Sequence, residues 1–469
     1  MLRTLRIQNF KAWKDTGEIR LAPLTVFFGT NSAGKSSIPQ LLLMLKQTVE
    51  SDDVHNPLQL GDPSKAVDLG IFEDIIHAHS KKEPVEFSIE WGINGTDNVL
   101  EDTLKNEKYP YDRLRLTSHI KAVSDKDGHL QPVVDWFQYQ VFNTDTMTMA
   151  FKNAMKTGSG KGKPEYEITC DNYDLKRIQG RVWPLPAPLK YYGFPDEVTK
   201  YFQNYLPLRD LVFNHEKRMK SIFYLGPLRD YPRRSYNWSG ERIKDVGIKG
   251  DHAIEALLAS GGRKYDFGKN QRKQTMQQIV AERLISMKLV SEIKIEQAGQ
   301  NRKEYDVFVK TGAGMPFVKL TDVGFGISQI LPVIVESFYV PHESVVVIEQ
   351  PEIHLHPRVQ ADMADVFIDA IKARENNQPR NCQFLVESHS EHLLRRLQLR
   401  IAEEKLTQND VAIYFVSNTA ENAVIEELQL DEFGNISNWP EDFFGDEMGD
   451  LVKRSEAEEK RMHGKVMES

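Results

Sequence analysis

The sequence has little cysteine, no long apolar run and no excess of positive charge. Cys170 and Cys382 are the only cysteines among 469 residues. We therefore expect no structural disulfide and a reducing, cytoplasmic compartment. The longest apolar runs, such as residues 330–335, are far shorter than the roughly 20 residues that span a bilayer, so no membrane role is expected. The formal net charge of -8 argues against a protein that coats nucleic acid indiscriminately.

What is present is the composition of a globular protein. Hydrophobic residues make up 40% of the chain, which is enough to build two or three lobes or one large domain with an insertion. Alternating apolar residues predict strands at residues 2–10 and 85–91, and helical spacing predicts a helix at residues 276–290. A closing pair of strands is expected at residues 411–416 and 423–430. Residues 92–222 give only a weak pattern.

Residues 24–37 form the most informative segment, because a strand-like apolar run leads into Gly-x-x-x-x-Gly-Lys-Ser and then a helical pattern. This is the arrangement of a phosphate-binding loop. Its glycines let backbone N-H groups turn towards a phosphate, Lys35 reaches the terminal phosphates, and the Ser36 hydroxyl can complete a Mg²⁺ shell. The predicted nucleotide-binding residues are Gly29, Asn31, Ser32, Ala33, Gly34, Lys35, Ser36 and Ser37.

Residues 344–349 are a β-branched run that ends in Glu349. Such a buried strand can bring a carboxylate beside a magnesium-bound triphosphate, whereas an ordinary core strand with a terminal glutamate is the alternative without the phosphate loop. The two spaced histidines His354 and His356 follow directly. A zinc site is conceivable there, but no further ligand lies nearby in the sequence.

Residues 383–390 predict another short strand, which ends in a polar cluster around His389. This is where a side chain that senses the γ-phosphate would lie. Residues 388–391 also fit a helix capping box, which explains the serines and the glutamate but does not require the histidine.

Residues 320–332 are small and polar at first and then form an apolar helical pattern. The amides of such a helix start, together with Ser328, can bind an anion. A plain connection from loop to helix is the alternative interpretation.

Taken together, these segments resemble the ABC-type ATPases of the OLD and RecF-like branch of the AAA family, relatives of the SMC ATPases. The resemblance rests on residues 5–11, 22–25 and 31–37, on the Walker B segment 347–357, and on the histidine switch 387–390. Residues 224–229 also resemble a recurring element of that family. The resemblance implies an α/β fold: an ABC-type head with a mixed sheet and an inserted helical or mixed lobe.

In this family two heads enclose two nucleotides, so the resemblance implies a homodimer or higher oligomer. It implies ATP bound by residues 29–37, Mg²⁺ held by Ser36 and Glu349, and a γ-phosphate monitored by His389. The partner head would contribute the signature residues Gly324, Gly326 and Ser328. The expected division of the chain is as follows: 1–91, head with phosphate loop; 92–222, insertion; 223–319, helical or mixed lobe; 320–445, remainder of the head; 446–469, charged tail.

One position departs from the family pattern. Many relatives carry a glutamate that polarises the attacking water, but this chain has Gln350, whose amide can orient water and cannot accept its proton. Glu352 is the candidate substitute, and we expect slow or partner-stimulated hydrolysis. The 80 residues after His389 contain no Asp-x-Asp pair, so we expect no nuclease domain of the OLD type.

Two functions agree with these features. The first is an ATP-driven switch in prokaryotic antiphage defence or DNA maintenance that controls a separate effector protein. The second is an ATP-bound scaffold with little hydrolysis. DNA contact is one interpretation of the basic residues that alternate with Tyr231, Tyr236 and Tyr265, and a solvated basic loop is the other. These basic residues are Arg229, Arg233, Arg234, Arg263, Lys264, Lys269, Arg272 and Lys273.

Overall fold

The computed structural model describes residues 1–440 apart from 81–82, 94, 96–97, 125, 127, 157–163, 181–182, 269–271, 300–301 and 420–421, and also residues 454, 455 and 457. Nearly all of the predicted charged tail therefore lies outside the described residues. The fold is α/β with mixed sheets, as predicted. No helix in the described part of the chain is both long and apolar enough to cross a membrane.

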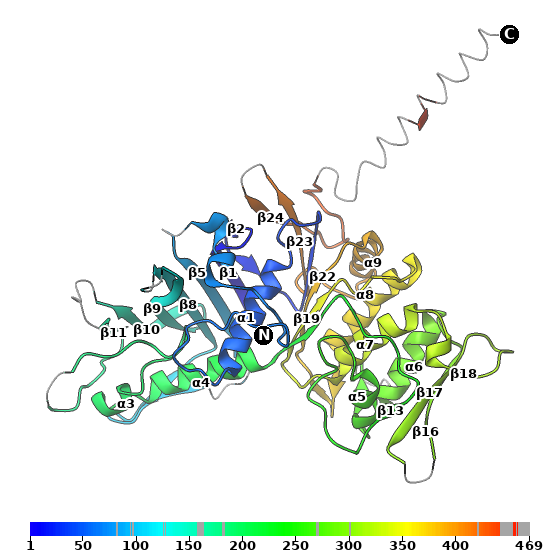
Figure 1. Cartoon of the computed structure of the whole chain (residues 1–469), viewed down its shortest axis with the longest axis horizontal. Coiled ribbons are helices and arrows are strands. Elements are labelled where there is room, and N and C mark those ends of the chain that lie inside the picture. Colours follow the sequence, from blue (N-terminus) through cyan, green and yellow to red (C-terminus); the bar gives the residue numbers. More distant parts are fainter. Residues whose placement is uncertain are drawn as a thin grey trace, which may run out of the picture.

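A six-stranded sheet forms the centre of the molecule (Figure 1). Five of its strands run parallel and only the last is antiparallel. In spatial order the strands are β12 (Ile222–Leu225), β19 (Val345–Glu349), β22 (Gln383–Glu387), β4 (Leu24–Gly29), β23 (Val411–Asn418) and β24 (Ala423–Glu427). The antiparallel pair β23 and β24 confirms the two closing strands predicted from the sequence.

Apolar side chains alternate along these strands between two separate cores. Val345 and Val347 of β19 face the first core, and Val346 and Ile348 face the second. This is the period-2 pattern of a strand that is buried on both faces. The first core holds α1 (Ser37–Glu50) and α4 (Leu206–Lys220), and the second holds α7 (Gly326–Tyr339), α8 (Pro357–Lys372) and α9 (Glu391–Ala402).

An eight-stranded antiparallel sheet lies beside the first core (Figure 1). Residues 92–222 contribute four of its strands, which extend the sheet begun by residues 2–20. Its strands are β1 (Leu2–Phe10), β2 (Trp13–Asp15), β3 (Ile19–Arg20), β5 (Val85–Gly92), β8 (Arg113–Ser124), β9 (Leu130–Asn143), β10 (Thr146–Met155) and β11 (Tyr166–Asp171). The strands predicted at residues 2–10 and 85–91 are thus confirmed, and they pair with each other.

The remaining elements are short and surround the two large sheets. The predicted helix at residues 276–290 is confirmed as α6 (Met276–Ser286), which Thr275 caps by accepting a hydrogen bond from the Gln278 backbone N-H. The other helices are α2 (Phe72–Ile75), α3 (Val198–Tyr201), α5 (Ala253–Ala259), η1 (His77–His79) and η2 (Leu320–Asp322). The small sheets contain β6 (Val99–Asp102), β7 (Glu107–Pro110), β13 (Tyr236–Asn237), β14 (Lys264–Asp266), β15 (Gln274–Thr275), β16 (Glu292–Gln297), β17 (Glu304–Lys310), β18 (Val318–Lys319), β20 (Arg374–Glu375) and β21 (Gln378–Pro379).

Candidate functional site

The predicted phosphate loop connects the end of β4 to the start of α1. Two glycines are required by its backbone. Gly29 has φ +142°, and a Cβ atom there would lie 1.9 Å from the Val416 carbonyl oxygen of the neighbouring strand. Gly34 has φ +100°, and a Cβ atom there would lie 2.6 Å from the Cβ atom of Ala12. Only glycine avoids both collisions and adopts these φ values without strain.

The Lys35 side chain is hydrogen-bonded to the backbone of its own loop. Its Nζ donates hydrogen bonds to the carbonyl oxygens of Gly29 at 3.0 Å and Thr30 at 2.7 Å, and only 4% of the residue is exposed. Burial lowers the pKa of Lys35, while the charges of Glu387 and Glu352 oppose this shift. The Lys35 ammonium is therefore buried within the loop that is predicted to bind phosphates.

The hydroxyl of Ser36 contacts a carboxylate that the motif analysis did not assign. Ser36 Oγ donates a hydrogen bond to Glu387 Oε1 at 3.1 Å. Glu387 ends β22, and its register partner on the neighbouring parallel strand is Glu349. Burial, followed by the charge of Glu387, raises the pKa of Glu349 to about 7. The signal for Glu387 is the strand order, because β22 lies between β19 and the phosphate-loop strand β4.

These oxygen atoms fit a Mg²⁺ ion. Mg²⁺ is a hard cation that proteins hold through one or two carboxylates together with substrate phosphates. Glu387 is 5% exposed, and its Oε2 atom accepts no hydrogen bond in the structure. A buried carboxylate oxygen without a partner is costly unless a cation compensates it. Ser36 and Glu349, the residues predicted to hold the ion, therefore lie beside a further buried carboxylate, Glu387.

Gln350 lies directly after Glu349, and its backbone is hydrogen-bonded to the end of β22. Its backbone N-H donates to the Glu387 carbonyl oxygen at 2.8 Å, which extends the pairing of β19 with β22 by one step. Its φ of +43° is unusual for a residue other than glycine. Burial raises the pKa of Glu387, and the Ser36 hydroxyl, the charge of Lys35 and the Gln350 amide oppose this shift.

Glu352 and His389 meet through a backbone contact. The backbone N-H of His389 donates to Glu352 Oε1, while Glu352 Oε2 has no partner. Burial raises the pKa of Glu352, and the hydrogen bond from His389 opposes the shift. The predicted capping box over residues 388–391 is wrong in its register, because the N-cap of α9 is Ser390, whose Oγ accepts from the Leu393 backbone N-H at 3.2 Å, and Glu391 pairs with Arg395. Helix capping thus explains Ser390. It does not account for His389, whose side chain is exposed.

The predicted signature residues lie on the other face of the central sheet. Gly326 begins α7, which packs in the second core, whereas α1 packs in the first. Ser328 is 7% exposed, and its hydroxyl donates to the Phe325 carbonyl oxygen at 2.6 Å. Gly324 has no atom within 4 Å of the position that a Cβ would take. Phosphate-loop helix and signature helix therefore do not share a face within one chain.

Several residues of the predicted basic surface are buried or paired. Arg229 is 5% exposed, and its Nη2 donates to the Glu349 carbonyl oxygen at 3.0 Å. This residue therefore lies buried at the end of β19 and is not part of a DNA-binding surface. Arg263 forms two hydrogen bonds with the Glu375 carboxylate at 2.8 and 2.9 Å. Tyr236 and Tyr265 are buried, which leaves only Tyr231 exposed among the three tyrosines. Lys269 lies outside the described residues.

The two histidines considered for zinc are separated by their local contacts. His356 begins α8, where its side chain accepts a hydrogen bond from the Arg358 backbone N-H. The His354 ring lies 5.1 Å from the Phe325 ring. Within the described residues, no group of three or more His, Cys, Asp and Glu side chains could hold a metal ion. The conceivable zinc site is therefore not supported.

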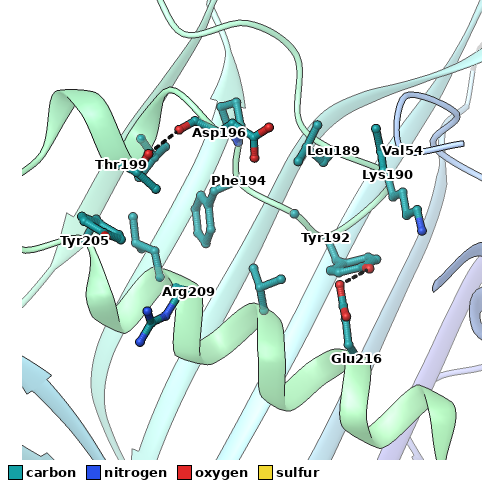
Figure 2. A pocket seen from close by; sticks show the side chains of 15 residues that line it. Val54, Leu189, Lys190, Tyr192, Phe194, Asp196, Thr199, Tyr205, Arg209 and Glu216 are labelled. Atoms are coloured by element: carbon teal, nitrogen blue, oxygen red, sulfur yellow. Dashed lines mark hydrogen bonds between the residues drawn. The ribbon is translucent and has the colours of Figure 1, made fainter. Parts of the chain in front are cut away.

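A pocket of about 230 Å³ lies apart from these residues, between α4 and the segment 189–196 (Figure 2). Phe194, Leu208 and Val212 make its wall apolar. At one end the Tyr192 hydroxyl donates to Glu216 Oε1 at 2.8 Å. None of the residues predicted to bind nucleotide lines this pocket.

Comparison with known proteins identifies two family models. The AAA ATPase domain model matches residues 1–180 and 268–394, and these ranges include the phosphate loop, Glu349 and His389. A model described as a protein of unknown function (DUF3696) matches residues 406–453. No curated protein matches the chain.

Solved structures of SMC heads are also similar to the chain, but only distantly. The SMC head bound to the C-winged helix domain of ScpA shares 12% identity, with coverage of 92% of this chain and 98% of that chain and a TM-score of 0.42. The SMC head domain from Thermotoga maritima shares 10% identity, with coverage of 91% and 99% and a TM-score of 0.38. The Pyrococcus furiosus head with an extended coiled coil, bound to the C-terminal domain of ScpA, shares 10% identity, with coverage of 92% and 96% and a TM-score of 0.37. Likenesses at this level assign neither activity nor partner.

Proposed function

The chain belongs to the AAA ATPase domain family, and on that premise we propose that it binds ATP with Mg²⁺ and acts as an ATP-dependent molecular switch. Residues 29–37 bind the phosphates, Ser36 and Glu349 hold the Mg²⁺, and His389 monitors the γ-phosphate. The observation that carries this proposal is the hydrogen bond between Ser36 and Glu387, because it joins the loop to the strand ends that bear the carboxylates.

The switch works as a homodimer or higher oligomer of ABC-type heads. An ATP bound at Lys35 lies on the face that α1 covers, while Gly324, Gly326 and Ser328 precede or begin a helix of the opposite face. A second copy of the chain is needed to bring these signature residues to the nucleotide. ATP binding closes the two heads, and hydrolysis reopens them.

The role we assign is control of a separate effector protein in the prokaryotic cytoplasm, in antiphage defence or DNA maintenance. DNA remains a candidate partner through the exposed residues Arg233, Lys264, Arg272 and Lys273. A solvated basic loop is the alternative for the same four residues. A binding constant that does not fall with added salt would argue against DNA contact at this surface.

Hydrolysis is slow or depends on a partner, since Gln350 cannot accept a proton from water. Glu352 is the residue we expect to take this role. Support comes from its hydrogen bond with the His389 backbone, which places it beside the proposed γ-phosphate sensor, and from its unpartnered Oε2 atom. The alternative function is an ATP-bound scaffold that organises a partner complex with little turnover. Gln350 is the observation that favours it.

Replacement of Lys35 by alanine tests the proposal. Loss of a charge-assisted contact with the phosphates should weaken ATP binding about 100-fold, which corresponds to about 2.7 kcal/mol. Calorimetry measures the binding, and light scattering with and without ATP measures the mass. ATP should raise the mass of the wild type and leave that of Lys35→Ala unchanged. Equal affinity of the two proteins for ATP would refute the proposed function.

Glu349→Gln separates the switch from the scaffold. Glu349→Gln also removes a charge from the proposed Mg²⁺ site, so it is compared with Glu352→Gln, which keeps the Mg²⁺ ligands and removes the proposed base. Both functions require Lys35, and both predict ATP-dependent association in the Glu352→Gln variant. A switch loses effector control when turnover stops, whereas a scaffold keeps it. The measurement is the activity of the co-purified effector in the presence of ATP.

A further inference from the structure

We propose that Glu387 is the second carboxylate of the Mg²⁺ site at the phosphate loop and that Gln350 positions it. This inference rests on the proposed binding of ATP with Mg²⁺. It adds a metal-side residue that no sequence motif assigns, and it gives a function to the glutamine that interrupts the Walker B pattern.

Contact with Ser36 places Glu387 at the ion. Glu387 Oε1 lies 3.1 Å from Ser36 Oγ, which is the hydroxyl that a phosphate loop directs to Mg²⁺. Oxygen ligands of Mg²⁺ lie about 2.1 Å from the ion, so two ligands on the same ion are about 3 Å apart. The observed separation, which a hydrogen bond sets in the structure, also matches that of two neighbouring ligands of one ion.

The second carboxylate oxygen of Glu387 indicates that a ligand is missing. Glu387 is 5% exposed, and its Oε2 atom has no hydrogen-bond partner. Glu349 is its register partner at the end of the adjacent parallel strand, and adjacent strands lie about 4.8 Å apart. The charge of Glu387 disfavours the charged form of Glu349, and a divalent cation bound by both carboxylates would remove this repulsion.

Because position 350 is a glutamine, no third carboxylate is added to those of Glu349 and Glu387. The backbone N-H of Gln350 is bonded to the Glu387 carbonyl oxygen, and its side-chain amide opposes the rise in the pKa of Glu387 that burial causes. A glutamate at position 350 would add its own carboxylate to those of Glu349 and Glu387. The amide can instead donate a hydrogen bond and hold the Glu387 side chain towards Ser36.

ATP binding by Glu387→Gln, measured with Mg²⁺ and with excess EDTA, tests the assignment. With Mg²⁺ the variant should bind ATP at least about tenfold more weakly than the wild type, because one ligand of the ion has lost its charge. With EDTA it should bind ATP as tightly as the wild type or more tightly, because a negative charge near the triphosphate has been removed. A defect of folding would weaken binding under both conditions, so this opposite response is specific to a metal ligand.

Glu391→Gln is the matched control. Glu391 lies four residues away, is partly exposed and pairs with Arg395 at 3.2 Å. Its replacement should leave ATP binding unchanged under both conditions. Glu387→Asp keeps the charge on a shorter side chain, and its binding with Mg²⁺ should lie between those of the wild type and Glu387→Gln. Thermal melting without nucleotide establishes that each variant is folded.

Two results would overturn the assignment of Glu387. One is a wild-type response to Mg²⁺ in Glu387→Gln, and the other is slower hydrolysis in this variant with unchanged Mg²⁺-dependent binding, which would place Glu387 on the attacking water. In either case Lys35→Ala tells the two proposals apart. If Lys35→Ala loses ATP binding, only the role of Glu387 fails; if Lys35→Ala binds ATP normally, the proposed function fails as well.

Discussion

The end of the six-stranded sheet and the aromatic cluster between the eight-stranded sheet and α4 both bury polar side chains, but of different kinds. At the end of the six-stranded sheet the buried groups carry charge: Lys35, Arg229, Glu352 and Glu387 are each no more than 8% exposed. Several of their polar atoms have no partner. Such a cluster is costly in the absence of a ligand.

The aromatic cluster between the eight-stranded sheet and α4 buries neutral groups that bond to one another. The Tyr191 hydroxyl and His215 Nε2 lie 2.8 Å apart, and the Tyr139 hydroxyl donates to the Tyr192 carbonyl oxygen at 3.1 Å. Trp91 packs against the same histidine ring. We infer that this region supplies stability and that the strand ends supply ligand binding. If so, substitutions in one region should leave the property of the other unchanged.

The largest expected effect on stability is that of Phe137→Ala in the eight-stranded sheet. Phe137 is fully buried, and its ring centre lies 4.9 Å from that of Phe194. Removal of a buried phenylalanine side chain costs about 3–5 kcal/mol. Urea unfolding measures this loss, and ATP affinity of the folded fraction should not change. Phe213→Ala is the control, because Phe213 is 64% exposed and its loss should cost little. Weaker ATP binding by the folded Phe137→Ala protein would contradict the inference that this region supplies stability and not ligand binding.

The two regions also differ in how much the sequence reveals. The phosphate loop, the strand that ends in Glu349 and the strand before His389 are predictable, because each is a local pattern whose residues are adjacent in the chain. Glu387 is not assigned in this way. Its contact with Ser36 depends on β22 lying between β19 and β4, which is a property of the topology.

The strands within residues 92–222 are hard to predict from the sequence for a different reason. Residues 113–120 of β8 do alternate, and Leu114, Leu116 and Ile120 are fully buried. The pattern is present, but polar and basic residues separate these side chains, and the pairing of β8 with β5 and β9 is not local. Arg229 shows the reverse problem. Its basic and aromatic neighbours indicate a surface, and only the tertiary fold buries it.

A pH dependence of stability is expected from His215. Burial lowers the pKa of this histidine to about 3, from 6.5 for the exposed ring. The unfolded chain therefore binds a proton as the pH falls below 6.5, while the folded chain does not, so stability is complete above this pH and declines below it. Between pH 7 and pH 5 the loss should be about 2 kcal/mol.

Urea unfolding of the wild type and of His215→Gln at both pH values isolates this effect. Other titrating groups, including the carboxylates of the strand ends, contribute equally to both proteins and cancel in the difference. His215→Gln is expected to be less stable at pH 7 and to lose about 2 kcal/mol less than the wild type on acidification. An identical pH dependence in the two proteins would show that His215 has the same pKa in the folded and unfolded states, against its burial in the fold.

The smallest expected effect on stability is that of Ser390→Ala. Ser390 is adjacent to His389, so the two residues allow stability and ATP turnover to be compared within the candidate site. Ser390 caps α9 through the Leu393 backbone N-H, and its hydroxyl donates to Gln360 Oε1 at 2.7 Å. Ser390→Ala should cost about 1 kcal/mol of stability and leave ATP binding intact. The exposed side chain of His389 has no capping role, so His389→Asn should keep full stability and slow ATP turnover. Melting curves should therefore show a loss of stability only in Ser390→Ala, and turnover assays should show slower hydrolysis only in His389→Asn. Proximity to the phosphate loop therefore does not by itself make a residue part of the proposed ATP site.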